Sequence, residues 1–469
     1  MNAEHRGGAT TTELPGGGRA RLPRLLAGIP SDGDALSLAE HRSLHGELPA
    51  FDSRHDGPAL IELVEASGLR GRGGGGFPAG AKLHAVAGAR KHGRSRPVVL
   101  VNGAEGEPAS FKDRTLLQAL PHLVLDGAEV AARAIGAQEV VLAVCDTAAD
   151  ALAGVRGALD ERARRPSRAP LRARLVTVPD RYLAGQESAL VSHVNGGPAL
   201  PTFTPPLPFE RGVGGRPTFV GNVETLAHIA LIARHGSDWF GELGPASQPG
   251  SALVTLSGTQ LAYPGVYEVE VGSPLPALLD AAGGLEEPRA LLVGGYCGGW
   301  VDGSLLRGVA LSDEHLAPYG AALGAGVIVL LSADTCPVAE LTRLTGWLAA
   351  QSAHQCGPCL FGLDAIATTV EQVMLGQAPR DAWRRLAGLG AVVRGRGACT
   401  HPDGAVRMLS SALEVFAEEL ADHARNGPCA ACERPSELPR PRPAASGPRA
   451  SVARYDNARS GASALAGTP

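Results

Sequence analysis

The alternation of strand-like and helix-like segments between residues 96 and 178 constrains the fold more than any other feature of the sequence. Apolar runs at 96–102, 139–146 and 173–178 are typical of buried strands, and helical patterns lie between them at 113–137 and 147–165. Strands that alternate with helices over short connections predict a parallel sheet. We therefore expect an α/β domain with a parallel sheet over residues 56–245.

The pattern changes near residue 250. Short strands are expected at 251–258, 264–272 and 290–295, with one short helix at 275–284. The second strand alternates, with Tyr267 and Val269 on one side and Glu268 and Glu270 on the other. This order predicts a small α+β module of the β-grasp type over residues 246–333.

The remaining segments differ in composition. Leucines and valines at spacings of three and four predict a helical bundle over residues 334–428. Residues 1–55 mix glycine, proline and charge, and we expect them to be partly disordered. Residues 429–469 are rich in Pro, Arg, Ser and Ala, and we expect a disordered tail.

Charge and hydropathy exclude several classes of protein. The net charge is -4 and the pI about 6.4, which does not favour nucleic acid or an acidic membrane surface as a partner. The longest apolar run, 321–333, is too short for a spanning helix of about 20 residues, and no export signal is present. We expect a soluble cytoplasmic protein without a transmembrane segment, either free or peripheral at the cytoplasmic face of a membrane.

The eight cysteines point to metal chemistry. Without an export signal a disulfide framework is not expected, and two C-x2-C pairs, 356/359 and 429/432, are typical of metal ligands. Isolated cysteines are usually small core residues, and we expect this of Cys145, Cys297 and Cys336. The histidines, His423 among them, show no ligand spacing.

Four further stretches carry chemistry. They are "GLRGRGGGGFPAGAKL" (68–83), "VNGAEGEPASFKDR" (101–114), "YLAGQESAL" (182–190) and "GNVETLAHI" (221–229). Glycines let backbone amides approach an anion, and Lys82 could neutralise a phosphate, although a flexible linker would also be rich in glycine. The second stretch follows the first strand, where parallel sheets form ligand crevices.

In this order, the four stretches resemble the flavin-carrying, F-type component of bacterial NADH-quinone oxidoreductase, the part of complex I that binds NADH, and its relatives in soluble hydrogenases and formate dehydrogenases. The resemblance implies an FMN-binding α/β domain, a β-grasp module of the soluble-ligand-binding (SLBB) type and a helical bundle that carries a [4Fe-4S] cluster. Glu107 matches the carboxylate near the nicotinamide of the substrate NADH, which makes it the catalytic candidate. The cofactor-binding residues implied are Gly71, Arg72, Gly73, Gly74, Phe77, Lys82, Asn102, Glu105, Tyr182, Glu187, Asn222 and Thr225.

The chain departs from the family pattern around both ligands. On the flavin side an aspartate, a glutamate and an asparagine are replaced, by Ala104, Gln186 and Gly221. On the NADH side Phe77 remains, but two stacking rings and a lysine are replaced, by Ala85, Leu207 and Thr204. A stacked ring contributes roughly 0.5–1.5 kcal/mol beyond its buried area, so we expect NADH affinity to fall by about one to two orders of magnitude.

The family binds its cluster with C-x2-C-x2-C and a fourth, distant cysteine. Here Cys356, Cys359 and Cys399 remain, whereas Ala353 occupies the first position. Imidazole can replace thiolate on iron, so we expect His354 to complete the ligand set. Three alternatives stay open: a three-ligated, labile or absent cluster, zinc on the same four residues, or a ligand from the 429/432 pair.

These observations predict an FMN-dependent oxidoreductase subunit. Electrons would pass from NADH or NADPH through FMN to the iron–sulfur cluster, and then to a ferredoxin-like, quinone-reductase or other iron–sulfur redox partner, including a membrane-bound acceptor reached through partner chains. The alternative is an electron-transfer or scaffold subunit of a redox complex that has lost nucleotide binding, which the altered NADH pocket favours.

Overall fold

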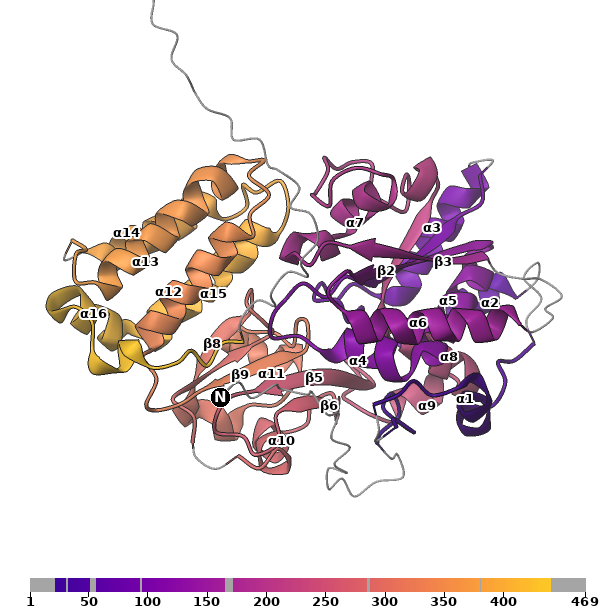
Figure 1. Cartoon of the computed structure of the whole chain (residues 1–469), viewed down its shortest axis with the longest axis horizontal. Helices are drawn as coiled ribbons and strands as arrows, with labels where there is room; N and C mark the ends of the chain where they lie inside the picture. Colours follow the sequence, from indigo (N-terminus) through magenta and orange to yellow (C-terminus); the bar gives the residue numbers. More distant parts are fainter. Residues whose placement is uncertain are drawn as a thin grey trace, which may run out of the picture.

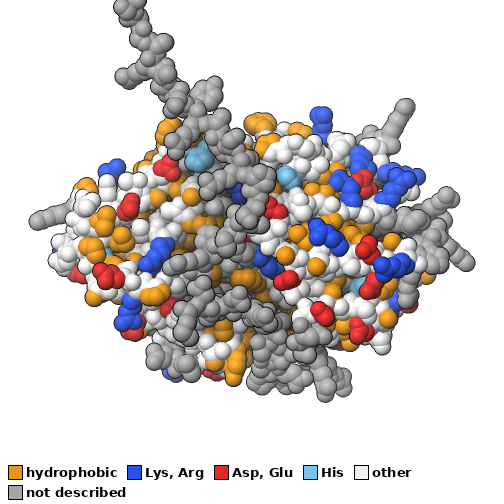
Figure 2. All heavy atoms as spheres, viewed as in Figure 1, with side chains coloured by type: hydrophobic (Ala, Val, Ile, Leu, Met, Phe, Trp, Pro, Cys, Tyr) orange, Lys and Arg blue, Asp and Glu red, His pale blue; other side chains and the backbone are white. Residues whose placement is uncertain are grey.

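The computed structural model describes residues 22–30, 33–50, 56–92, 95–164, 172–284, 287–379 and 381–439. Figure 1 shows three bodies: an α/β body on the right, a second sheet below the centre, and a group of helices on the left. The expected disorder of residues 1–21 and 440–469 lies outside the described residues. On the face seen in Figure 2, basic and acidic side chains are interspersed, in keeping with the small net charge.

The first body is built on a parallel four-stranded sheet of order β3-β2-β1-β4, as predicted. Its strands are β1 (Val98–Gly103), β2 (Glu139–Cys145), β3 (Arg172–Val178) and β4 (Thr218–Asn222). Alternate residues of each strand enter two cores, one on each side of the sheet. The helices are α1 (Leu38–His45), α2 (Gly57–Ala66), α3 (Ala79–His92), α4 (Lys112–Ala119), α5 (Pro121–Ile135), α6 (Ala149–Ala163), α7 (Glu187–Val194), α8 (Val223–His235) and α9 (Ser237–Gly241).

The helix expected over 113–137 is two helices, α4 and α5. Leu120 between them has φ -128 and ψ 44, outside the helical region, and Pro121 begins α5. A proline cannot donate to the preceding turn and is tolerated at the first helical position. The break matters because it places the start of α4 at the cavity described below.

The N-terminal region contains ordered structure within the stretch expected to be partly disordered. The backbone N–H groups of Arg24, Leu25 and Leu26 donate to one carboxylate oxygen of Glu268, at 2.7, 2.7 and 3.1 Å. Leu25 and Leu26 are buried in the core of the α/β body. Residues 22–30 therefore fasten the first body to the second sheet.

The second body is a five-stranded sheet of order β6-β5-β9-β7-β8. β5 pairs in parallel with β9, and the other neighbours are antiparallel. Three strands and the helix match the prediction, whereas β8 and β9 were not predicted. The elements are β5 (Ser251–Ser257), β6 (Gly265–Glu270), α10 (Leu275–Ala281), β7 (Ala290–Val293), β8 (Gly299–Asp302), α11 (Asp313–Leu316) and β9 (Val327–Leu331).

The third body contains α12 (Pro337–Ala350), a π-helical turn η5 (Pro358–Leu363), α13 (Asp364–Met374), α14 (Ala382–Val393), α15 (His401–Val415) and α16 (Ala417–Asn426). Their apolar faces share one core. Among the described residues, no helix is both long enough and apolar enough to span a bilayer. The short 3-10 turns of the chain are η1 (Tyr182–Gly185), η2 (Val213–Gly215), η3 (Gly303–Gly308), η4 (Ala317–Tyr319) and η6 (Ala430–Glu433).

The boundary of the disordered tail at residue 429 was wrong. Residues 429–439 are described, form η6, and bury Leu438 in the core of the helical body. Composition alone could not detect this, because the contacts that hold the segment come from residues about 100 positions away.

Candidate functional site

A cavity of about 630 Å³ lies where the three bodies meet, within the range of cofactor sites. The α/β body contributes the glycine-rich loop and the ends of β1 and β4, the second sheet contributes Gly294–Gly298, and the helical body contributes Cys399–Arg407. Cys356, Cys359 and His354 do not line it. The predicted residues that the cavity brings together are Gly71, Arg72, Gly73, Gly74, Phe77, Lys82, Asn102, Glu105, Glu107, Tyr182, Glu187, Asn222, Thr225 and Cys399.

The glycine-rich loop forms a closed turn on the cavity. Gly71 N–H donates to the carbonyl of Phe77 at 2.8 Å, which ties the two ends together. Gly74 and Gly76 have φ +100 and +59, backbone conformations that L side chains rarely adopt. A Cβ on Gly73 would lie 3.3 Å from Cβ of Asn222. The loop thus needs glycine for its turn and for its close approach to β4.

Arg72 does not direct its side chain at the cavity. Its backbone N–H donates to the Thr225 hydroxyl at 2.9 Å, and its guanidinium donates to the carbonyl of Ser251 at 2.9 Å. The guanidinium also lies 3.9 Å from the Glu224 carboxylate. Arg72 therefore ties the glycine loop to α8 and β5, and any contribution to a cofactor would come from its backbone.

A buried ionic network lies on the cavity wall, and the sequence analysis missed its charged members. Nζ of Lys112, 2% exposed, lies 2.7 Å from the Asp113 carboxylate and 2.9 Å from that of Glu224. Asn222 accepts from Lys112 at 3.3 Å and donates to Asp113 at 2.6 Å. Burial raises the pKa of Asp113 to about 6, although the Lys112 charge opposes this shift. The only signal in the sequence was "FKDR" directly after the strand-end loop.

Glu105 acts as a helix cap in the structure. Its carboxylate accepts from the Ser110 hydroxyl at 2.6 Å and from the N–H groups of Asp113 and Arg114, each at 3.1 Å. These N–H groups belong to the first turn of α4 and have no partner within the helix. Glu105 thereby anchors the helix that presents Lys112, whatever contact it makes with a cofactor.

Glu107 is buried and accepts from the backbone N–H of Tyr296 at 3.0 Å. Burial raises the pKa of Glu107 to about 8, and the nearby charge of Glu105 adds to the shift. A carboxyl group with a pKa near neutrality can hold or release a proton at physiological pH. The structure thus gives Glu107 the properties of an acid–base group facing the cavity.

Tyr182 joins the α/β body to the helical body at the cavity. Its ring packs edge-on against Trp347, with centroids 5.4 Å apart, and lies 5.5 Å from the ring of His401. Its backbone N–H donates to the Gln351 side chain at 3.0 Å. Burial raises the pKa of Tyr182 well above its ordinary value, so the phenol remains a hydrogen-bond donor.

The opposite wall is more exposed. Lys82 pairs with Glu187, and the Phe77 side chain is 59% exposed. A Cβ on Gly221 would lie 2.8 Å from the Phe219 ring, so this chain has no room for the asparagine of the family at that position. The three substituted NADH-side positions, Ala85, Thr204 and Leu207, do not line the cavity.

The three predicted cluster cysteines lie on two neighbouring loops of the helical body. Burial acts to raise the pKa of Cys356, but the backbone N–H groups of Ala398 and Cys359 more than offset it and lower the pKa. The loop of Cys356 therefore touches the loop that carries Cys399, which lines the cavity. His354 is exposed, with φ +52 and its N–H donating to the Ser352 hydroxyl at 3.1 Å.

A second histidine near these cysteines was not predicted. His401 follows Cys399 closely, lines the cavity and is 3% exposed. Its Nε2 lies 2.8 Å from the carbonyl oxygen of Leu348, and its buried Nδ1 has no hydrogen-bond partner among the described residues. A buried ring nitrogen without a partner is uncommon and can signal a ligand.

Comparisons with known proteins agree with this site. A family profile described as the Nuo51 FMN-binding domain matches residues 64–231, and one described as the NADH-ubiquinone oxidoreductase-F iron-sulfur binding region matches residues 339–423. The NAD+-reducing [NiFe]-hydrogenase in its H2-reduced state superposes with a TM-score of 0.74 at 29% identity, covering 87% of this chain and 67% of that chain.

Curated relatives carry the same signal along most of the chain. An F-type component of NADH-quinone oxidoreductase in Rhizobium meliloti (strain 1021), the second of that type by its name, is 31% identical over 87% of this chain and 99% of its own length. The F-type component in Mycobacterium bovis (strain ATCC BAA-935 / AF2122/97) is 30% identical over 81% of this chain and 87% of its own length. The chain belongs to the family of F-type components of NADH-quinone oxidoreductase.

Proposed function

We propose that this chain transfers electrons from NADH, or NADPH, through FMN to a [4Fe-4S] cluster and on to an iron–sulfur partner. One observation carries the proposal: a single cavity is lined on one side by the glycine loop and on the other by Cys399. A flavin in that cavity would lie beside the cluster loop. The family profiles for an FMN-binding domain and an iron–sulfur binding region support both cofactors.

FMN, when bound, accepts two electrons from a nicotinamide and releases them one at a time. The chain would hold and orient it. Lys82 would neutralise the phosphate, which requires that it exchange part of its contact with Glu187 for the ligand. Asn102, Asn222 and Thr225 would contact the flavin from the ends of β1 and β4.

Glu107 would hold a proton beside the nicotinamide. Its burial and its raised pKa support this role. The Tyr182 phenol would remain a neutral donor at the boundary between flavin and cluster. Both side chains face the same cavity, so each can act without a large movement of the backbone.

The fourth cluster ligand is proposed to be a histidine. His354 is adjacent to the vacant position 353, and its exposure leaves its ring free to turn. His401 is the competing residue, because its buried Nδ1 has no described partner. Iron content and paramagnetic resonance of the reduced protein should separate them. His354→Ala should alter the cluster signal and His401→Ala should leave it unchanged; the reverse pattern would transfer the role to His401.

Two structural assignments accompany this function. The hairpin β5–β6, the helix α10, and a last strand that inserts in parallel beside the first support a β-grasp module of the SLBB type. The helices α12–α16 support a cluster-carrying bundle. The partners would be iron–sulfur redox chains, and the complex would lie in the cytoplasm or at the cytoplasmic face of a membrane.

The rival is a scaffold or electron-transfer subunit without nucleotide binding. It is favoured by the NADH-side positions, since Ala85, Thr204 and Leu207 do not line the cavity. An absorption spectrum of anaerobically purified protein tests the choice. We expect flavin and cluster bands that bleach when NADH or NADPH is added. A colourless, folded protein would favour the rival, as would a flavin that neither nucleotide reduces.

A further inference from the structure

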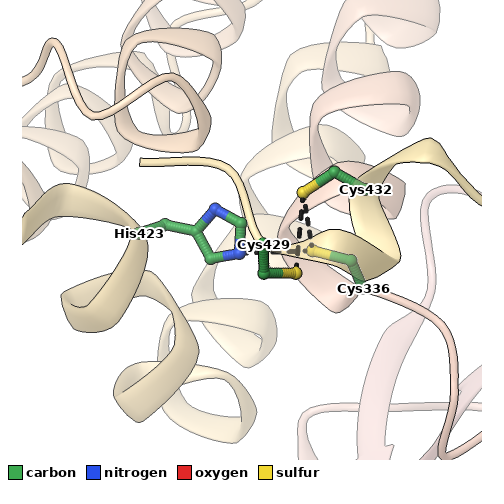
Figure 3. Close-up of side chains that lie close together, drawn as sticks. All are labelled: Cys336, His423, Cys429 and Cys432. Atoms are coloured by element: carbon green, nitrogen blue, oxygen red, sulfur yellow. Dashed lines mark hydrogen bonds between the residues drawn. The ribbon is translucent and has the colours of Figure 1, made fainter. Parts of the chain in front are cut away.

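A second group of metal-binding side chains lies apart from the cavity. It consists of Cys336, His423, Cys429 and Cys432, whose ligand atoms all lie within 4.8 Å of one another (Figure 3). None of the four lines the cavity, and three of them fall outside the matched iron–sulfur region. We propose that this group binds one zinc ion, and that the ion fastens the C-terminal segment of the described chain to the helical body.

The separations fit a single tetrahedral ion. Zinc binds thiolate at about 2.3 Å and imidazole at about 2.05 Å, so a tetrahedron would place two sulfurs about 3.8 Å apart and sulfur and nitrogen about 3.6 Å apart. Sγ of Cys432 lies 3.7 Å from Sγ of Cys429 and 3.5 Å from Sγ of Cys336. Nε2 of His423 lies 3.4 Å from Sγ of Cys336. These values agree with the expected edges.

The histidine is already oriented as a ligand. Nδ1 of His423 lies 3.3 Å from the carbonyl oxygen of Met374, which can only accept, so Nδ1 carries the ring proton. The lone pair of Nε2 then points at the three sulfurs (Figure 3). A backbone carbonyl that holds the second nitrogen of a metal-bound histidine is the usual outer support of such sites.

Other uses of these cysteines fit less well. An iron–sulfur cube binds each thiolate to a different iron, so its thiolate sulfurs cannot lie as close together as these. A disulfide needs a bond of about 2.05 Å, whereas the 3.7 Å between Cys429 and Cys432 leaves both thiols free. Three thiolates and one imidazole are the donors that zinc prefers in structural sites.

The four ligands come from separate parts of the fold. Cys336 is the N-cap of α12 and is 2% exposed, His423 lies in the last turn of α16, and Cys429 and Cys432 flank η6. The ion would therefore join both ends of the helical body to the segment 427–439, which we call the C-terminal strap. A metal contributes most when it links distant segments, because the unfolded chain has no preformed site.

The strap connects the zinc group to the catalytic cavity. The Ser436 hydroxyl donates to Glu340 on α12 at 2.7 Å, and Glu437 accepts from the Thr259 N–H after β5 at 2.9 Å. The Tyr296 hydroxyl donates to the carbonyl of Pro439 at 2.6 Å, while its backbone N–H holds Glu107. The strap thus bridges the second sheet and the helical body beside Glu107.

Metal analysis of purified full-length protein, prepared without added metal, tests the site. We expect about one zinc per chain, which is lost in the double variant Cys429→Ser/Cys432→Ser while the iron content stays unchanged. Cys356→Ser should show the opposite loss, of iron and not of zinc. Cys145→Ala, a buried cysteine of β2, is the matched control and should keep both. Wild-type protein without zinc would overturn the proposal, as would a double variant that retains zinc or loses iron instead.

Hydrogen exchange tests the role of the ion separately from its presence. Removal of zinc with a chelator should speed exchange of the strap amides 428–439 at least tenfold, and added zinc should restore protection. The core amides of β1 and β2 serve as the internal reference, because an unfolded sample would lose protection there too. A strap that exchanges equally with and without zinc would overturn the fastening role.

Discussion

The two walls of the cavity differ in how they hold charge. The buried wall, defined by Glu107, Lys112 and Asp113, places ionisable groups out of solvent, and each has a described partner. The exposed wall, defined by Phe77, Lys82 and Glu187, presents a ring and an ion pair that solvent reaches. The same residue types therefore have different energetic weight on the two sides.

The difference indicates which wall tolerates change. A buried charge that loses its partner costs about 3–5 kcal/mol, whereas an exposed ion pair contributes at most about 1 kcal/mol. The departures from the family on the NADH side concern exposed positions such as Leu207, which is 44% exposed. We infer that the NADH side can vary without loss of the fold, and that the buried wall cannot.

The largest expected effect is that of Lys112→Met. The substitution would leave Asp113 and Glu224 buried without their shared cation, and should lower the free energy of unfolding by about 3–5 kcal/mol. Lys82→Met on the exposed wall is the matched control and should cost at most about 1 kcal/mol. Thermal unfolding of both variants measures the contrast. Equal losses would show that the two walls do not differ.

The second prediction concerns pH and Glu107. Its pKa of about 8, against an ordinary 4.5, means that the folded state keeps a proton which the unfolded chain has lost. Its contribution to stability is therefore complete at low pH and is lost as the pH rises from about 4.5 to about 8.

Glu107→Gln should remove this dependence. Between pH 6 and pH 8 the wild type should lose about 2–3 kcal/mol that the variant keeps, at about 1.4 kcal/mol per pH unit. The melting temperatures of the two flavin-free proteins at both pH values measure it. A pH profile that is the same for both would show that Glu107 is ionised when folded.

The parallel sheet could be predicted because its strands are continuous apolar runs, and such runs depend on few long-range contacts. The residues of the cavity followed from the family motifs. Lys112 and Asp113 were missed because charges in the first turn of a helix ordinarily face solvent. Here the cap by Glu105 and the contact with α8 bury them.

The zinc group could not be predicted for a different reason. Cys336 is separated from Cys432 by 96 positions and carries no local motif, so only the packing of α12 against η6 reveals the pair. His423 looked like one histidine among many. Compositional bias after residue 429 also hid an ordered segment, since the signal for disorder begins before the strap ends.

The third prediction concerns the flavin phosphate. If Lys82 neutralises it, Lys82→Ala should weaken FMN binding about 5- to 30-fold, the equivalent of about one to two kcal/mol for a partly exposed charge contact. Flavin content after purification and titration of the flavin-free protein measure it. Glu187→Gln is the informative companion, because it removes the competing partner of Lys82 and should not weaken FMN. Equal FMN affinity in Lys82→Ala and wild type would remove the role.

The smallest expected effect lies on the exposed wall, at Leu207. Leu207→Phe would restore a ring that the family has there, but the position is 44% exposed and does not line the cavity, so the gain should fall near the low end of a stacking contact. About 0.5 kcal/mol corresponds to roughly a twofold lower KM for NADH with an artificial acceptor. Leu44→Phe, a leucine of α1 with similar exposure at 47%, is the control and should leave KM unchanged. A KM already low in the wild type would mean that NADH does not need the missing rings. No change in Leu207→Phe would mean that the exposed wall binds the nucleotide through Phe77 alone.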